Sequence, residues 1–290
     1  MTDPREADPL TEAIRLTDIR FRYRGTRHRA LDGVSVAARR GEFLGIVGPS
    51  GAGKSTLALV MSGQIPAFVE GALGGEALLF GRTTRGMRSA DLAETVGMVY
   101  QDPEAQLYGL TVEEELSVGL ENRCVAPDEI RRRITWVLEV TGLHDILDRS
   151  PYALSGGQKQ RVVIAGVLAL QPRILVLDEP TSALDPRGKS ALYALLARLS
   201  GDGVTVVIVE HDIERLVQHA DRVCWLEEGR IRALGSPREV FGRVQEDDRR
   251  VVRVPQVAQL AHRLGRAPPY SVTVDDAVAT FRPLVEAVDR

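Results

Sequence analysis

The chain has 290 residues, of which 44% are hydrophobic, as expected for one large globular domain with an appendage or for two modest domains. Its formal net charge of −3 gives no basic field that would favour nucleic acid as the main partner. The two cysteines, Cys124 and Cys224, are too few for a disulfide framework and lack metal-ligand spacing. The sequence has no run of the ~20 apolar residues that a membrane span requires, and its polar N-terminus does not resemble a signal peptide. We therefore expect a cytosolic chain that does any membrane work through a partner.

The predicted elements follow one another in a strand-and-helix order. Residues 1–12 are expected to form a flexible tail. After it, the pattern predicts a half-buried strand at Ile14–Tyr23, a short apolar strand at Phe43–Val47, a helix from about Lys54, helices over Asp128–Leu147 and Ser155–Leu170, and apolar strands at Ile174–Leu177 and Val204–Val209. The charged stretch Gln245–Arg250 is a predicted linker, and Val254–Arg290 a small helical element.

The three short apolar runs are typical of strands buried on both faces of a parallel sheet. They end at Gly48, at Asp178-Glu179 and at Glu210-His211. Ligands of open α/β sheets bind beyond the carboxyl ends of the strands, so the three ends predict a single site.

The segment Gly48-Pro49-Ser50-Gly51-Ala52-Gly53-Lys54-Ser55 fits a phosphate-binding loop between a strand and a helix. Glycines let backbone amides turn towards phosphate oxygens, and the helix adds its positive end. Lys54 would reach the β- and γ-phosphates, and the Ser55 hydroxyl would bind Mg²⁺. The alternative is a glycine-rich turn that only connects strand to helix.

Asp178 and Glu179 follow a predicted buried strand. Asp178 would hold Mg²⁺, and Glu179 would position or deprotonate the attacking water. Acidic residues also begin ordinary loops, so this interpretation depends on the phosphate loop.

The segment Leu154–Gln158 begins a predicted helix, with Ser155 as a good N-cap. Lys159 and Arg161 lie in its first turns, where the helix dipole disfavours cations. An anion that binds there would resolve the conflict; the alternative is a plain helix start.

Three further residues are candidates because of their neighbours. His211 could contact the γ-phosphate, Gln101 could contact Mg²⁺ or the water, and the Tyr23 ring could stack on adenine. The alternatives are a structural histidine, a surface amide and a core aromatic.

These motifs together resemble the ATP-binding-cassette family. In family terms they are the Walker A loop (Gly48–Ser55), Q-loop (Gln101), signature (Leu154–Gln158), Walker B (Ile174–Glu179), D-loop (Ser182–Asp185) and switch (His211). The resemblance implies an α/β fold with a RecA-like P-loop NTPase core over residues 13–244, an antiparallel β subdomain and an inserted α-helical subdomain at about 102–166. It leaves 245–290 as a C-terminal extension and dimerisation element.

The resemblance also implies that two cassettes face head to tail around ATP and Mg²⁺. The implied catalytic residues are Glu179, His211 and Gln101, and the implied metal ligands are Ser55, Gln101 and Asp178. The implied nucleotide contacts are Tyr23, Gly48, Pro49, Ser50, Gly51, Ala52, Gly53, Lys54, Ser55, Thr56, Ser155, Gly156, Gly157, Gln158 and Asp185.

A finer resemblance is to the ATPases of energy-coupling-factor importers, which take up vitamins or transition-metal ions such as cobalt and nickel. It is carried by Gln101–Leu107, Thr111-Val112-Glu113, Gly119–Asn122, Pro151-Tyr152-Ala153 and Val254-Pro255-Gln256 with Leu260 and Leu264; Asp102 departs from the more usual asparagine. It implies a peripheral subunit at the cytoplasmic face of the cell membrane, paired with an identical or paralogous cassette. It also implies a transmembrane coupling subunit and a substrate-binding membrane subunit, with Gln106 and its neighbours as the docking surface.

Two other classes of function compete with an importer ATPase. One is a soluble ATPase of the same family that acts on nucleic acid or ribosomes, but Thr56–Leu154 lacks the sustained heptads of relatives with DNA roles and the chain has a single set of motifs. The other is a module that binds nucleotide without turnover, which would not need Glu179. An ATPase of another importer class stays open.

Overall fold

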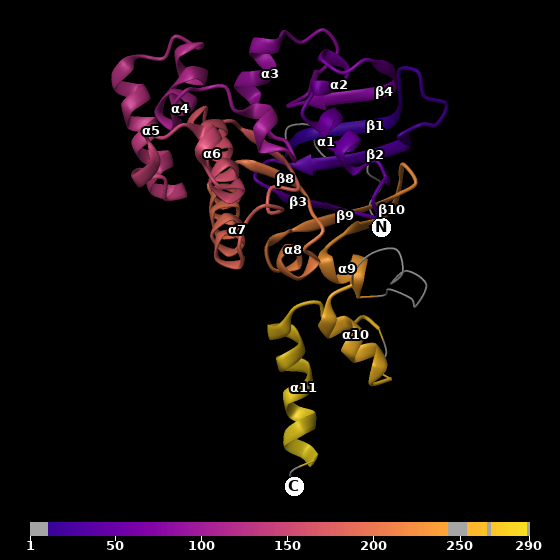
Figure 1. Ribbon diagram of the computed structural model, residues 1–290. Coiled ribbons are helices and arrows are strands. Elements are labelled where there is room, and N and C mark those ends of the chain that lie inside the picture. The colour runs from indigo at the N-terminus through magenta and orange to yellow at the C-terminus, as the bar shows by residue number, and fades with distance from the viewer. Residues whose placement is uncertain (1–10, 243–253, 266–267, 289–290) are drawn as a thin grey trace.

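The computed structural model describes residues 11–242, 254–265 and 268–288. Most of the predicted tail and the predicted linker Gln245–Arg250 lie outside the described residues. Figure 1 shows the described chain as two sheets with a group of helices to one side, further helices against the sheets, and the C-terminal helices below.

The first sheet is antiparallel, with strands in the order β2-β1-β4-β5. Its strands are β1 (Glu12–Tyr23), β2 (Leu31–Arg39), β4 (Gly71–Leu79) and β5 (Arg82–Thr83). Strand β1 includes Glu12, which the sequence analysis placed in the tail, because Glu12 is buried, pairs with Arg39 and forms an ion pair with Arg15.

The second sheet has the order β10-β9-β3-β8-β7-β6. Its strands are β3 (Phe43–Val47), β6 (Val96–Val99), β7 (Ile174–Asp178), β8 (Thr205–Val209), β9 (Arg222–Glu227) and β10 (Arg230–Gly235). All neighbouring pairs are parallel except β9 and β10. The strands predicted from the three apolar runs are therefore adjacent, in the order β3-β8-β7.

Successive residues of these central strands point to two different cores. Leu175, Leu177 and Ile208 pack with the helices α6 (Gly156–Ala169), α7 (Pro186–Gly201) and α8 (Ile213–His219). Val176 and Val207 pack with α1 (Lys54–Met61) and with the antiparallel sheet. Burial on both faces explains why these strands are continuous apolar runs.

The helical region contains η2 (Pro103–Gln106), α4 (Val112–Glu121), α5 (Pro127–Thr141), η3 (His144–Ile146), η4 (Pro151–Ala153) and α6. The helix predicted to end at Leu147 ends at Thr141, because Gly142 has a φ of 66° and caps it in the left-handed conformation. The helix predicted from Ser155 is α6, with Ser155 as its N-cap.

The other helices are α2 (Gln64–Ala67), α3 (Ser89–Thr95), α9 (Pro237–Phe241), α10 (Gln256–Arg263) and α11 (Val274–Val288). The C-terminal region is helical as predicted. Helix α10 buries Ala258 and Ala261 in the core beneath the central sheet, and its first amide donates to Glu214 Oε1 of α8 at 2.7 Å. None of the helices in the described part of the chain is long and apolar enough to span a membrane.

Candidate nucleotide-binding and hydrolytic site

The phosphate loop joins β3 to α1 and needs glycine at two positions. Gly48 has a φ of 154°, and a Cβ there would lie 2.1 Å from the Leu226 carbonyl oxygen. Gly53 has a φ of 98°, and a Cβ there would lie 2.3 Å from the Ala30 carbonyl oxygen. The loop is thus pressed against neighbouring backbone, so only glycine fits at these two positions.

Lys54 is buried at the first position of α1, and its Nζ donates to the Pro49 carbonyl oxygen at 3.0 Å. Burial lowers the pKa of this amine, and the negative charges of Glu179 and Asp178 act in the opposite direction. The side chain therefore lies over the loop and faces the acids at the end of β7, the position in which it can bind a polyphosphate.

Asp178, the last residue of β7, is 6% exposed, and the Ser55 hydroxyl lies close to its carboxyl group. Burial raises the pKa of this carboxyl; the nearby Ser55 hydroxyl lowers it and the charge of Glu179 raises it further. Its Oδ1 is buried without a hydrogen-bond partner among the described residues. A hydroxyl beside an unsatisfied carboxylate oxygen fits Mg²⁺, which proteins often hold through one or two carboxylates and the phosphates of the nucleotide.

Glu179 contacts Gln101 and His211, two further residues that were predicted for the site. Its Oε2 accepts a hydrogen bond from Gln101 Nε2 at 2.9 Å, and its Oε1 lies 2.9 Å from His211 Nε2. Its φ is 47°, in the left-handed region, and its amide donates to the Val209 carbonyl oxygen at 3.0 Å. A strained conformation held this way in a non-glycine residue is typical of functional sites. The structure thus brings together side chains from the ends of β6, β7 and β8.

Glu210 contributes to this arrangement and was missed as a site residue. It is 4% exposed, and its carboxylate accepts hydrogen bonds from Thr181 Oγ1 at 2.5 Å, His211 N at 2.9 Å and Asp212 N at 3.2 Å. It fastens the loop that carries Glu179 to the loop that carries His211. An acidic residue at the end of an apolar strand, next to a candidate histidine, was the available signal.

Tyr23 ends β1, and its hydroxyl forms a 3.0 Å hydrogen bond with Thr56 Oγ1 on α1. Its ring meets Phe21 edge to face, with 4.9 Å between the ring centres. Tyr23 also lines a cavity of about 520 Å³ with Pro66 and Val69. The residue is therefore half-buried beside the phosphate loop, and its stacking on adenine stays a prediction.

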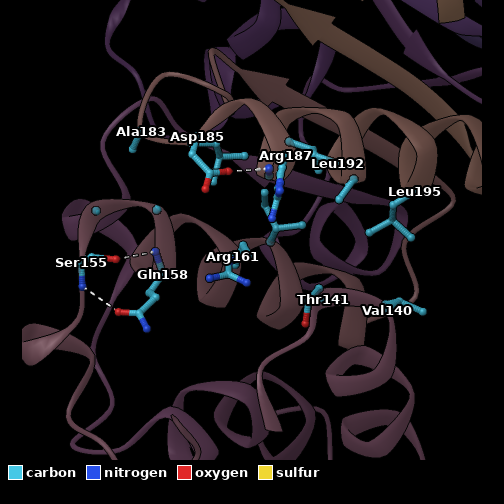
Figure 2. Close-up of a pocket in the computed structure, with 16 residues that line it drawn as sticks. Val140, Thr141, Ser155, Gln158, Arg161, Ala183, Asp185, Arg187, Leu192 and Leu195 are labelled. Atoms are coloured by element: carbon cyan, nitrogen blue, oxygen red, sulfur yellow. Dashed lines mark hydrogen bonds between the residues drawn. The ribbon is translucent and has the colours of Figure 1, made fainter. Parts of the chain in front are cut away.

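The signature segment forms the first turn of α6. Ser155 Oγ accepts from Gln158 N at 3.3 Å, and Gln158 Oε1 accepts from Ser155 N at 3.0 Å, a reciprocal capping box (Figure 2). Gly157 lies close to the D-loop, because a Cβ there would be 3.0 Å from the Ala183 carbonyl oxygen. Asp185 is the N-cap of α7 and accepts from Gly188 N at 2.6 Å.

The predicted conflict between cations and the α6 dipole is resolved for one residue within the chain. Lys159 forms an ion pair with Glu104. Gln106, predicted to lie at a docking surface, is tied to β6: its Oε1 accepts from Tyr100 N at 2.7 Å and its Nε2 donates to the Met98 carbonyl oxygen at 3.0 Å. Both amide atoms are used within the fold, and the docking role of Gln106 and its neighbours stays a prediction.

Comparison with known proteins agrees with this geometry. The profile of the family described as ABC transporter matches residues 31–182. The energy-coupling factor transporter ATP-binding protein EcfA2 of Symbiobacterium thermophilum is 41% identical over 262 residues, which cover 88% of this chain and 89% of that protein. The chain belongs to the ABC transporter family. This membership confirms the resemblance found in the motifs.

Solved structures of ABC cassettes share the fold. The cassette cbiO1 from Clostridium perfringens, described as part of the ABC transporter complex cbiONQ, matches with a TM-score of 0.72 and 34% identity over 87% of this chain and 99% of that chain. A dimeric ATP-binding cassette in a post-hydrolysis state, bound to ADP and phosphate, matches with a TM-score of 0.69 and 29% identity over 77% of this chain and 98% of that chain. The predicted P-loop NTPase fold is therefore confirmed.

Proposed function

We propose that this chain is the ATP-binding and ATP-hydrolysing subunit that energises an importer of the energy-coupling-factor type. The observation that carries the proposal is the position of Glu179. Both its carboxylate oxygens are engaged at 2.9 Å, one by Gln101 and one by His211, at the strand ends beside the phosphate loop.

Each residue of this site has a role in the proposed reaction. The amides of the loop bind the polyphosphate, and Lys54 exchanges its bond to Pro49 for phosphate oxygens. Ser55 and Asp178 would hold Mg²⁺, with Gln101 as a further oxygen ligand, and the bound ion would neutralise charge on the phosphates. Glu179 orients the attacking water and accepts its proton, while His211 fixes the direction of the Glu179 carboxylate.

The signature segment serves the nucleotide of a second cassette, identical or paralogous, in this proposal. Ser155 and Asp185 cap two neighbouring helices, and the cavity beside them is lined by residues of α5, α6, α7 and the D-loop. The dimeric cassette among the structural relatives supports a paired assembly. The C-terminal extension would add to the pairing, because it exposes four apolar side chains. These are Leu260 on α10, Leu264 directly after the end of α10, and Val274 and Val278 on α11.

A second surface fits the membrane partner. Tyr108, Leu110 and Tyr152 have exposed fractions of 76%, 75% and 58%. The Tyr152 hydroxyl donates to the Leu107 carbonyl oxygen at 3.1 Å, so the two segments form one apolar patch beyond the Q-loop. Exposed apolar patches mark interaction sites, and we propose that this one docks on a transmembrane coupling subunit at the cytoplasmic face of the membrane.

The cargo class in this proposal is a vitamin or a transition-metal ion, selected by a substrate-binding membrane subunit. The patch favours this function over a soluble ATPase acting on nucleic acid or ribosomes. Affinity purification from solubilised membranes separates the two: recovery of a polytopic membrane protein supports the importer, and recovery of nucleic acid or ribosomes without it contradicts the proposal.

Replacement of Glu179 by glutamine tests the hydrolytic site. We expect Glu179→Gln to bind Mg·ATP and to lose phosphate release, because glutamine keeps the hydrogen-bonding shape and cannot accept the proton. ATP-dependent dimers should accumulate in gel filtration of the variant with its partner cassette. Glu139→Gln, an exposed acid-to-amide change on α5, is the matched control. Near-normal phosphate release by Glu179→Gln would contradict the mechanism.

A further inference from the structure

Helix α10 of the C-terminal extension is fastened to α8, the helix that follows the switch histidine. The amide of Gln256, the first residue of α10, donates to Glu214 Oε1 at 2.7 Å. Figure 1 shows α10 below α8 and the large sheet. Among the described residues, this is the one hydrogen bond that joins the two helices. A single contact that substitution can remove therefore links the extension to the helix beside the hydrolytic site.

The Glu214 carboxylate supplies a cap that α10 lacks. The first amides of a helix have no partner within it, and its positive end favours a negative charge. Helix α10 has no acidic residue in its first turn, and its N-cap Pro255 makes no side-chain hydrogen bond. Glu214 lies in the first turn of α8, so its carboxylate stabilises the start of α10 from another helix.

Burial also holds α10 in this place. Ala258 and Ala261 of α10 are 1% and 3% exposed. They belong to the same hydrophobic core as Ile213 and Leu216 of α8. The core thus anchors the body of α10, while the Glu214 bond fixes where the helix begins relative to α8.

The junction of the two helices reaches the reacting groups. A cavity of about 610 Å³ is lined by Glu179 and His211 of the hydrolytic site and by Gln256 and Gln259 of α10. The start of α10 therefore forms part of the wall beside the catalytic pair, and a change in its position changes the surroundings of that pair.

The position of His211 depends on its backbone, because its side chain is 48% exposed and little packing holds it. On one side, Glu210 accepts a hydrogen bond from the His211 amide at 2.9 Å. On the other, the amide of Ile213, the first residue of α8, donates to the His211 carbonyl oxygen at 3.1 Å. A shift of the first turn of α8 therefore moves the imidazole relative to Glu179 Oε1, which lies 2.9 Å from His211 Nε2.

We propose that Glu214 is a positioning residue for ATP hydrolysis. By holding the start of α10 against the first turn of α8, it sets the position of His211, so docking of the C-terminal extension and turnover are coupled. This inference rests on the proposed function, because it concerns the reaction assigned to Glu179. Equilibrium coupling between two sites is reciprocal, so closure of the hydrolytic site on ATP should also hold α10 more firmly.

Two variants remove the bond from opposite sides. Glu214→Ala removes the acceptor. Gln256→Pro removes the donor and keeps the helix, because proline lacks the N–H and is favoured at the first position of a helix. In steady-state phosphate release with the partner cassette, each should lower kcat by about threefold to tenfold and leave the KM for ATP within about twofold. The double variant should be no slower than the slower single variant, because both changes remove the same bond.

Matched controls keep the bond. Glu214→Gln retains an acceptor oxygen, and Gln256→Ala retains the amide while it removes the side chain that lines the cavity. Both should keep kcat within about twofold of the wild type. The unfolding temperature of each variant shows whether the chain still folds.

Hydrogen exchange of α10, followed by mass spectrometry, tests the reciprocal effect. In Glu179→Gln with Mg·ATP and the partner cassette, the amides of α10 should exchange at least about threefold more slowly than without nucleotide. Addition of Glu214→Ala should remove this difference. A purely structural role of Glu214 would speed exchange equally with and without ATP.

Three results would overturn the inference. The first is wild-type kcat in folded Glu214→Ala and Gln256→Pro. The second is an equal loss of kcat in Gln256→Ala, which would assign the effect to the side chain. The third is α10 exchange that does not respond to ATP. A wild-type pair that releases no phosphate would contradict the proposed function as well, whereas normal turnover in the variants contradicts this inference alone.

Discussion

Glu210 provides a test of how the hydrolytic site is held in place. In Glu210→Ala, three donors lose their acceptor: the Thr181 hydroxyl and the amides of His211 and Asp212. Each buried polar group left without a partner costs about 1–3 kcal/mol. Water can enter the space of the lost side chain and satisfy part of this set, so we expect a total loss of about 3 kcal/mol.

Glu210→Gln should cost less than about 1 kcal/mol, because the amide oxygen can accept from the two backbone amides while the amide nitrogen donates to Thr181 Oγ1. For a chain of 290 residues the unfolding entropy is about 0.6 kcal/mol/K, so the alanine variant should unfold about 5 °C below the wild type. Glu139→Ala, at an exposed position of α5, should unfold within about 1 °C of the wild type.

Thermal unfolding and steady-state phosphate release of the three Glu210 forms provide the assay. His211 should lose its position against Glu179 in the alanine variant, so kcat should fall while the KM for ATP stays nearly constant, and glutamine should restore both stability and kcat. Equal unfolding temperatures and equal kcat values for wild type and Glu210→Ala would refute the reasoning. So would full additivity of Glu210→Ala with Thr181→Val, since residues that share a hydrogen bond should couple.

Three further predictions concern single residues of the site. Burial raises the pKa of Asp178 above its ordinary 3.8, so the folded state binds the proton more tightly than the unfolded state and stability falls as pH rises through this window. Asp178→Asn should therefore raise the unfolding temperature of the nucleotide-free chain at pH 8 and remove the further rise caused by Mg·ATP; a lower temperature without nucleotide would contradict this. Gly48→Ala should cost about 3 kcal/mol in urea unfolding and abolish ATP binding, because its Cβ would meet the Leu226 carbonyl oxygen, whereas Gly86→Ala, with open space around it, should cost about 1 kcal/mol; equal costs would refute the steric argument. Lys54→Ala should weaken ATP by about 10- to 100-fold in calorimetry, and unchanged affinity would count against its contact with phosphate.

The strands of the site could be predicted from the sequence because strands that are buried on both faces consist of continuous apolar residues. Phe43–Val47, Ile174–Leu177 and most of Val204–Val209 became β3, β7 and β8, and their polar ends meet as expected. Their order was not predictable, since β3 lies between β8 and β9, pairings that join residues more than a hundred positions apart. Local patterns carry no information on such long-range register.

The hydrogen-bond and ion-pair partners of individual polar side chains could not be predicted from the sequence either. The anion that Lys159 needs is Glu104, from a segment 55 positions earlier. Gln106 was predicted to lie at a docking surface, and no pattern in the sequence indicated its hydrogen bonds to the end of β6. Glu210 was noted only as the end of a strand, but it accepts three hydrogen bonds. Glycine patterns and residue order revealed the phosphate loop, whereas these roles depend on which side chains the fold places within 3 Å of one another.

Strand β3 runs through the middle of the large sheet, with β8 on one side and β9 on the other. The phosphate loop follows this strand, whereas both site acids and the switch histidine follow strands from the second half of the chain. A break in the exposed connection between α4 and α5 would therefore yield two fragments, neither with a complete site. Insertion of β3 between β8 and β9 would restore both the sheet and the site. Nucleotide affinity could therefore report, in a split-protein sensor, that the two fragments have associated.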